Sequence, residues 1–100
     1  MVNRTLRWSF RAENNLNEIL AFYMKRNGSS VYGDKLKVRI TKVLNGIVSN
    51  PYSGQKHGKR GFRFVVVKPF QIFYRVTKTE IRISVVWDTR RDPKTLKLTR

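Results

Sequence analysis

Two clusters of basic residues hold most of the side chains in this sequence that are suited to chemistry. The first is K-H-G-K-R-G-F-R, residues 56–63, and the second is V-V-W-D-T-R-R-D-P, residues 85–93. Guanidinium and ammonium groups bind phosphate or carboxylate and stabilise negative charge that develops during a reaction. The sequence therefore indicates an anionic substrate or partner.

Several other kinds of site are excluded by composition. His57 is the only histidine and the chain has no cysteine, which rules out the usual zinc ligand sets and any disulfide. A Ser-His-acid triad would require His57, in a glycine-rich loop, to meet its partners by chance. The six acidic residues are scattered, and the sequence has no glycine-rich nucleotide-binding fingerprint. We expect neither a metal nor a cofactor.

The net charge is the strongest signal in the composition. The chain has 22 lysine and arginine residues against six aspartate and glutamate residues, a formal net charge of +16. Such a charge attracts nucleic acid, an acidic membrane surface or an acidic protein, and composition favours nucleic acid. Because the chain is short and has no membrane-spanning apolar run or signal peptide, we expect one cytoplasmic domain, residues 1–100.

Periodicity predicts the elements that position these clusters. A short strand covers Thr5 to Trp8, a helix capped by Ser9 covers residues 10–26, and a second helix runs from Ser29 or Ser30 to Asn50-Pro51. After a loop over 52–61, strands follow at 62–67, 70–76 and 81–87. The apolar stripes of the helices are Leu16, Ile19, Leu20 and Tyr23, then Leu36, Ile40, Val43, Leu44 and Ile47. We expect an α+β fold in which an antiparallel helical hairpin packs on a mainly antiparallel sheet.

Alternation along the strands assigns their side chains to two faces of the sheet. The helices are expected to cover Phe62, Phe64, Val66, Phe70, Ile72, Tyr74, Val76, Ile81, Ile83, Val85 and Trp87. The opposite face, called the open face below, would hold Arg63, Val65, Val67, Gln71, Phe73, Arg75, Arg82, Ser84, Val86 and Asp88. Since this assignment exposes four large apolar side chains beside arginines, we expect a partner to cover them.

Four polar side chains are expected to converge on the open face, namely Arg63, Gln71, Arg75 and Arg90. In this interpretation Asp88 orients Arg90 so that the guanidinium fork holds a phosphate or a carboxylate. Two plainer interpretations stay open. Asp88 and Asp92 pair with Arg90 and Arg91 to stabilise the turn before Pro93, or Lys56 and Lys59 are solvated loop charges.

Motifs along nearly the whole chain are similar to those of one protein family. They are W-S at residues 8–9, L-x-x-I at 16–19 followed by Tyr23, N-P-Y-S-G at 50–54, G-F-R at 61–63, F-Q-I-F-Y-R-V at 70–76 and D-T-R-R-D-P at 88–93. Their order and spacing, with the size and the basic charge, resemble the RelE/ParE superfamily of bacterial toxins from type II toxin-antitoxin systems. The resemblance implies a cytoplasmic toxin neutralised by an acidic, partly disordered antitoxin that covers its helices and sheet. Antitoxin-binding residues would be Val65, Val67, Phe73 and Val86.

The resemblance implies one of two targets. A RelE-like toxin cuts mRNA in the ribosomal A site without a metal, and Arg63 and Arg90 match basic catalytic residues of such toxins. A ParE-like toxin poisons DNA gyrase and has no nuclease activity. In either case the residues expected to bind nucleic acid or the target are Lys56, His57, Lys59, Arg60, Gln71, Arg75 and Arg91.

Departures from the nuclease pattern favour the ParE-like branch. Gln71 stands where the nucleases usually have arginine, Asp88-Thr89 replaces a Gly-His or Gly-Lys pair, and the tail has no tyrosine. Proton transfer during RNA cleavage would then depend on His57 or on lysines. A different class of function, a non-catalytic RNA- or ribosome-binding protein in which Phe73 stacks on a base, is the alternative.

Overall fold

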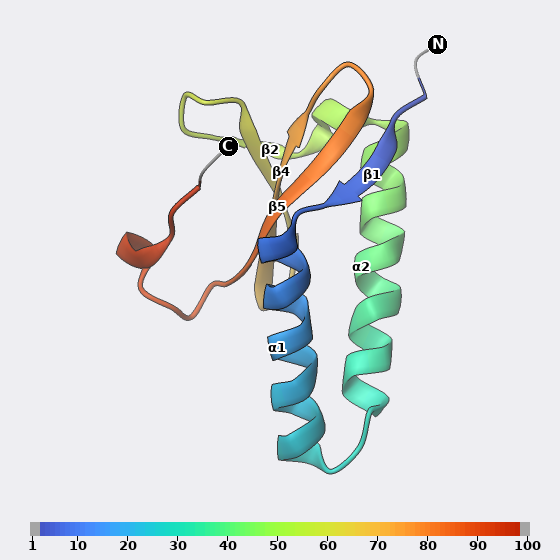
Figure 1. Ribbon diagram of the computed structural model, residues 1–100, viewed down its shortest axis with the longest axis vertical. Coiled ribbons are helices and arrows are strands. Elements are labelled where there is room, and N and C mark those ends of the chain that lie inside the picture. The colour runs from blue at the N-terminus through green and yellow to red at the C-terminus, as the bar shows by residue number, and fades with distance from the viewer. Residues whose placement is uncertain (1–2, 99–100) are drawn as a thin grey trace.

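The computed structural model describes residues 3–98, in which two long helices pack against one face of a five-stranded sheet (Figure 1). The elements in chain order are β1 Thr5–Trp8, α1 Phe10–Asn27, α2 Val31–Ser49, the 3-10 helix η1 Pro51–Ser53, β2 Gln55–His57, β3 Phe62–Val67, β4 Phe70–Val76, β5 Glu80–Asp88 and the 3-10 helix η2 Pro93–Thr95. This arrangement confirms the predicted α+β class. No helix among residues 3–98 is long and apolar enough to cross a membrane.

The sheet has the strand order β1-β5-β4-β3-β2. Strand β1 runs parallel to β5, and the other neighbours are antiparallel. The first and last strands of the chain are therefore direct neighbours. Strand β2 lies in the segment predicted as a loop, because a three-residue polar strand at a sheet edge has no apolar alternation to reveal it.

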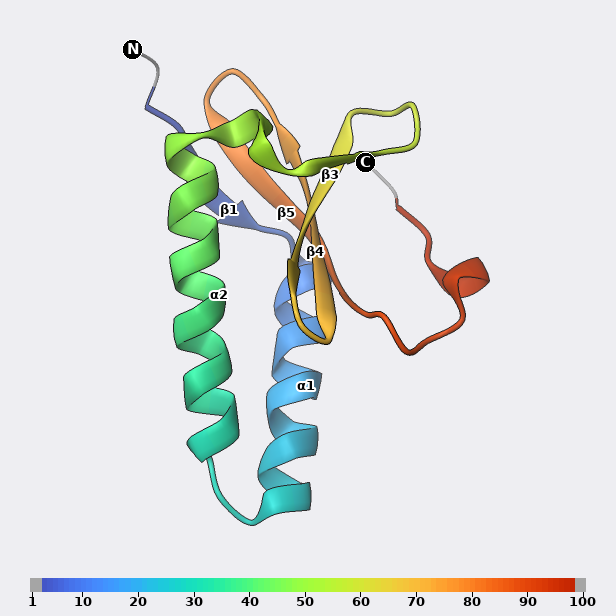
Figure 2. The ribbon, with the colours of Figure 1, turned by 180° about the vertical axis from the view of Figure 1, so that it is seen from behind.

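Local sequence signals explain where the helices begin and end. The Ser9 hydroxyl accepts a hydrogen bond from the Ala12 amide at 3.0 Å, which caps α1 as predicted. Gly28 ends α1 with a φ of 68°, a left-handed conformation that glycine adopts without strain. Helix α2 ends at Ser49, and its C-cap is Asn50 directly before Pro51, where the sequence predicts the end. The two helices lie side by side, and their connecting loop extends beyond the sheet (Figure 2).

The main core lies between the hairpin and the sheet. Both predicted helical stripes face it, and Leu36, Ile40, Leu44 and Ile47 are buried there against Ile72, Tyr74, Ile81 and Ile83. Gly33 allows close approach of the helices, since a Cβ atom there would lie 3.0 Å from a methyl group of Leu20. This side of the sheet is called the helix face below.

A smaller apolar cluster lies on the open face. Phe73, Val85 and Trp87 are buried there, with Phe64, Leu96 and Leu98 packed against them. The segment after β5 leaves the sheet on the side away from α2 and carries the two leucines (Figures 1 and 2). Part of the open face is therefore covered by the chain itself.

The predicted faces of β3 are reversed. Val67 and Phe70 are direct cross-strand partners across the turn at Lys68-Pro69, and such partners lie on the same face. Val65 and Val67 therefore belong to the helix face with Arg63, whereas Phe64 packs on the open face. A two-residue hairpin turn pairs the two residues that flank it. The short turn at Lys68-Pro69 was therefore the sequence signal that could have placed Val67 and Phe70 on the same face.

The predicted faces of the side chains in the second half of β5 are also reversed, for a different reason. Tyr74 pairs with Ile83 but Phe73 pairs with Val85, so Ser84 is an extra residue that forms a bulge. Beyond the bulge Val85 and Trp87 lie on the open face, and Val86 packs in the main core. The alternation predicted the opposite because it cannot anticipate an inserted residue.

Candidate functional site

Arg90 is held at the end of the sheet by two partners. Its Nε and Nη2 atoms donate to the two carboxylate oxygens of Asp88 at 2.9 and 2.7 Å, and Nη2 also donates to the Tyr23 hydroxyl at 3.2 Å. These hydrogen bonds are the contact through which Asp88 is predicted to orient Arg90. The hydrogen bond from Arg90 lowers the pKa of Asp88, which partial burial opposes. The same hydrogen bond raises the pKa of Arg90.

A hollow of about 220 Å³ lies beside Arg90, between α1 and the end of β5. Its apolar lining includes Ile19, Phe22 and Val86, and its polar lining includes Glu18 and Arg91. The Phe22 side chain is 55% exposed although it is a large aromatic ring. An arginine in fixed orientation beside an exposed aromatic side chain is typical of a protein-binding hot spot.

Arg63 lies elsewhere on the helix face. Its Nη1 atom donates to the carbonyl oxygens of Tyr52 and Gly54 at 3.0 and 2.9 Å, and its guanidinium carbon lies 5.2 Å from the centre of the Tyr52 ring. The guanidinium of Arg63 is therefore hydrogen-bonded to backbone carbonyl groups that follow α2. Lys56 is its cross-strand partner on β2.

The basic loop and the tail flank a separate region of the open face. His57, Gln71 and Arg91 line a hollow of about 370 Å³, where the guanidinium of Arg91 lies 4.8 Å from the Trp87 ring centre. An adjoining hollow of about 310 Å³ is lined by His57 with Lys59 and Arg60. Five of the residues predicted to bind nucleic acid or the target are thus brought together: His57, Lys59, Arg60, Gln71 and Arg91.

The predicted convergence of Arg63, Gln71, Arg75 and Arg90 is wrong. Phe70 pairs with Asp88 and Gln71 pairs with Trp87, so Asp88 and Gln71 are near in the ladder but lie on opposite faces. Arg75 lies on the open face at the other end of β4. The reversed face of β3 and the bulge in β5 together separate the four side chains.

The four residues predicted to bind the antitoxin are not an exposed surface. Val67 and Val86 are buried in the main core, and Val65 packs against it. Phe73 does lie on the open face, but it is only 1% exposed because Leu96 and Leu98 pack against its cluster. The alternative in which Phe73 stacks on a nucleic-acid base loses its exposed ring for the same reason.

The turn after β5 contains one of the two ion pairs expected if Asp88 and Asp92 pair with Arg90 and Arg91 to stabilise it. Asp88 pairs with Arg90, as that interpretation requires. Asp92, however, accepts from the Lys94 amide at 3.0 Å and begins η2, and Arg91 lies over Trp87 instead of Asp92. Only one of the two predicted ion pairs is present.

Sequence reasoning missed the contribution of Tyr23. Its places in the apolar stripe of α1 and in the family motif predict no polar partner, but its hydroxyl reaches Arg90 and its ring centre lies 4.2 Å from that of Tyr32. Burial, more than its contact with Tyr23, raises the pKa of Tyr32. A tyrosine at the edge of an apolar helix stripe was the one available signal for a polar contact.

The residues that the structure describes contain no group of histidine, aspartate and glutamate side chains suited to holding a metal ion. Their charged groups are suited to binding anions or an acidic surface. The two clusters differ in character, since the hollow beside Arg90 is mainly apolar and the hollows near His57 are flanked by basic side chains.

Comparison with known proteins places this geometry in a family. The family model described as the ParE toxin of the type II toxin-antitoxin system, parDE, matches residues 6–93. A comparison with curated proteins gives no significant match.

Two solved structures are similar to the chain in fold. One is the chromosomal ParDE TA system from P. aeruginosa, with a TM-score of 0.73 and 23% identity over 86% of this chain and 96% of that chain. Another is the E. coli DinJ-YafQ toxin-antitoxin complex, with a TM-score of 0.56 and 9% identity over 89% of this chain and 96% of that chain. Since the family model covers most of the sequence and the fold agrees, the chain belongs to the ParE toxin family of type II toxin-antitoxin systems.

Proposed function

We propose that this toxin acts in the cytoplasm by binding DNA gyrase, and that it does not cleave mRNA. A cognate acidic antitoxin neutralises it. The observation that carries the proposal is the separation of Arg63 and Arg90, the two residues that match nuclease positions. Each is held by acceptors of its own chain in a different part of the helix face.

RNA cleavage requires several groups around one phosphate. A base must take the proton of the 2'-hydroxyl, an acid must protonate the leaving oxygen, and cations must stabilise the charge that develops between them. His57, the only histidine of the chain, is on the open face and edge-on to Phe73, with ring centres 5.0 Å apart. It therefore does not share a site with Arg63 or Arg90, which lie on the helix face.

The hollow beside Arg90 supports binding of a protein target. Asp88 and Tyr23 fix the guanidinium before any partner arrives, so binding costs little further side-chain entropy. Phe22 offers exposed apolar area at the same place. We assign Arg90 to the gyrase contact as a binding residue.

An acidic antitoxin fits the charge of the chain. The net charge of +16 attracts an acidic protein and repels other copies of the toxin. The similar structures are described as a ParDE system and as a toxin-antitoxin complex, which supports a partner of this kind here.

Two assays on the purified protein test the target. We expect inhibition of supercoiling by DNA gyrase and no cleavage of ribosome-bound mRNA. Supercoiling should return to its normal level when the toxin is saturated with its antitoxin. Cleavage of mRNA on the ribosome together with normal supercoiling would overturn the proposal.

Arg90→Ala tests the assigned contact. We expect it to abolish growth inhibition on induction while the circular dichroism spectrum stays that of the wild type, because the variant loses a preoriented guanidinium at the surface. Arg90→Lys, which keeps the charge but not the fork, should also lose most of the effect. Full toxicity of folded Arg90→Ala would remove this residue from the target contact.

A further inference from the structure

A row of arginines crosses the open face at the end of the sheet opposite to Arg90. Strand pairing places Arg7 of β1 beside Arg82 of β5, and Arg82 beside Arg75 of β4. Partners in register lie on the same face. Since Leu6 and Trp8 pack in the main core, as do Ile81 and Ile83, the arginines between them point to the open face. These three residues are called the arginine row below.

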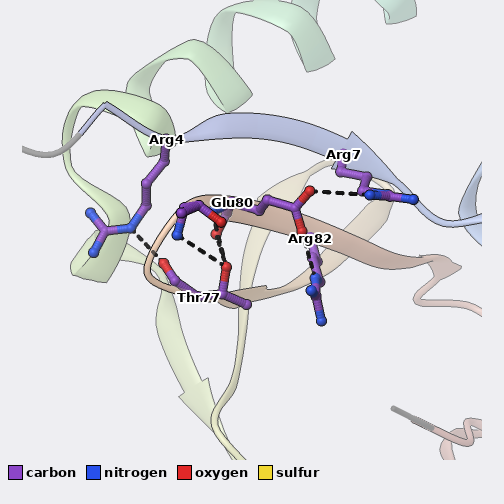
Figure 3. A network of polar contacts seen from close by, with 6 residues as sticks. Arg4, Arg7, Thr77, Glu80 and Arg82 are labelled. Carbon is purple, nitrogen blue, oxygen red and sulfur yellow. Dashed lines mark hydrogen bonds and ion pairs between the residues drawn. The ribbon is translucent and has the colours of Figure 1, made fainter.

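One carboxylate holds two members of the row. Glu80 accepts from Arg82 Nε at 2.8 Å and from Arg7 Nη1 at 3.3 Å, and both guanidinium groups turn toward it in Figure 3. The hydrogen bond from Arg82 and then that from Arg7 lower the pKa of Glu80. The Arg7 and Arg82 side chains are still 72% and 60% exposed. Glu80 therefore orients both arginines while most of their donors stay free.

The third member of the row rests on an aromatic ring. The guanidinium carbon of Arg75 lies 5.1 Å from the ring centre of Phe62, its cross-strand partner on β3. Phe62 is only 3% exposed, so its ring supports Arg75 and is not available to a base. The three row residues therefore present cationic forks, and the ring beneath Arg75 is closed to base stacking.

A hollow of about 570 Å³ adjoins the row. Arg75 and Arg82 line it together with Ser9, Phe10 and Arg11 at the beginning of α1, and Phe10 is 78% exposed. The first turn of a helix contributes partial positive charge, which adds to that of the side chains. Arg11 also donates to the carbonyl oxygen of Lys97, which fixes its position.

We propose that the arginine row and this hollow bind the phosphate backbone of duplex DNA. Neighbouring strands lie about 4.8 Å apart, so the three guanidinium groups cover about 10 Å of surface and can contact successive phosphates. Arginine at all three positions matches the two-point geometry of phosphate oxygens. Arginine contacts to phosphates suit a duplex, whose phosphates lie outside and whose bases are paired within. The proposal goes beyond the proposed function and does not require gyrase.

A charge-matched pair of variants tests the proposal. The triple variant Arg7→Gln, Arg75→Gln and Arg82→Gln removes the row, and Lys35→Gln, Lys37→Gln and Lys42→Gln removes the same charge from the exposed side of α2. Binding to a fluorescent 20-base-pair duplex is measured by anisotropy between 50 and 300 mM salt. We expect the row variant to bind about 10- to 100-fold more weakly than the α2 variant at 100 mM salt.

The salt dependence measures the same contacts independently. The slope of log affinity against log salt should fall by roughly 2 to 3 in the row variant and by less than about 1 in the α2 variant. If affinity and salt slope fall equally in both variants, net charge alone attracts the duplex, and the proposal is overturned. If the triple variant does not fold, Arg82→Gln alone is expected to lower the slope by about 1. An unchanged slope in that folded variant would also overturn it.

Polyglutamate distinguishes DNA from an acidic protein as the occupant. It is added as a competitor at matched charge concentration, and we expect it to displace the duplex much less effectively from the wild type than an unlabelled duplex does. Equal competition by the two polyanions would overturn the assignment to DNA. Because no gyrase is present, failure here leaves the proposed function untouched, and a failed supercoiling assay leaves this result untouched.

Discussion

Arginines on the two faces of the sheet are used in different ways. On the helix face, Arg63 donates twice to backbone carbonyls and Arg90 donates three times to Asp88 and Tyr23. On the open face, Arg7 and Arg82 each donate once, to a carboxylate that they share. An arginine has five N–H donors, so the open-face residues keep most of theirs for a partner. The acceptors around a residue thus decide its role, and the residue type does not.

The contrast has a local cause in the chain. Arg63 faces the turn that follows α2, where backbone carbonyls lack helical partners, and Arg90 follows an aspartate two positions before it. The open face has one acidic residue near the arginine row, Glu80, and two arginines compete for it. The free energy of unfolding should therefore depend more on Arg63 than on Arg7 or Arg82.

The largest expected effect comes from the turn that holds Arg63. Its carbonyls are fixed because the buried Tyr74 hydroxyl donates to Pro51 O at 2.8 Å and accepts from the Gly54 amide at 3.0 Å. A Cβ atom at Gly54 would lie 2.2 Å from that hydroxyl. We expect Gly54→Ala to lower the free energy of unfolding by about 3 kcal/mol, measured by urea denaturation.

Gly46 provides the control for this substitution. It lies within α2, and a Cβ atom there meets nothing within 4 Å. Gly46→Ala should raise the free energy of unfolding by about 0.5 to 1 kcal/mol, because alanine favours the helix. Similar destabilisation by both variants would mean that the contact with Tyr74 does not fix the turn.

The next effect separates the two groups of arginines directly. Arg63→Ala leaves two backbone carbonyls without their donor, and we expect a loss of about 1 to 2 kcal/mol in the free energy of unfolding. Arg82→Ala, in a side chain that is 60% exposed, should leave the denaturation midpoint unchanged within error. Equal destabilisation by the two substitutions would break the distinction between the faces.

The smallest expected effect is a pH dependence of the melting temperature, caused by the contact between Asp88 and Arg90. The pKa of Asp88 is lowered in the folded state, so its charged form stabilises the fold above its unfolded pKa of about 3.9. That contribution is lost as the pH falls through the lower folded pKa. The melting temperature of Asp88→Asn should therefore lie below that of the wild type at pH 6, and the difference should shrink as the pH falls below about 4.

The same substitution made in an Arg90→Gln variant tests whether Arg90 causes this pH dependence. When Arg90→Gln is already present, the effect of Asp88→Asn should no longer vary with pH, because the main cause of the pKa shift has been removed. The same variation in both backgrounds would show that Arg90 is not the cause.

Sequence patterns predicted the elements better than they predicted the site. The helix stripes follow from local periodicity, and both helices begin and end within a residue or so of the expected positions. The Ser9 cap is present as predicted, whereas Ser30 at the start of α2 makes no capping hydrogen bond with its side chain. The faces of β3 and β5 depend on register, which was misjudged at the turn before Phe70 and altered by the bulge at Ser84. The Asp88–Arg90 pair was predicted because the two residues are neighbours in sequence.

The missed features all join distant parts of the chain. Tyr23 reaches Arg90 across 67 positions, and the arginine row needs β1 to lie beside β5. The leucines of the tail bury Phe73 only because the segment after β5 folds back over the open face. Periodicity within one element carries no information about such contacts.

The parallel pairing of β1 with β5 also affects how the chain is made. Thr5 pairs with Glu80 and Trp8 with Ile83, so the first strand has no neighbour in the sheet until the last strand has left the ribosome. Contacts between such distant positions form late, after most of the chain entropy has been lost. An incomplete nascent chain therefore has neither the finished sheet nor the arginine row. The toxin fold is therefore completed only after β5 has been synthesised.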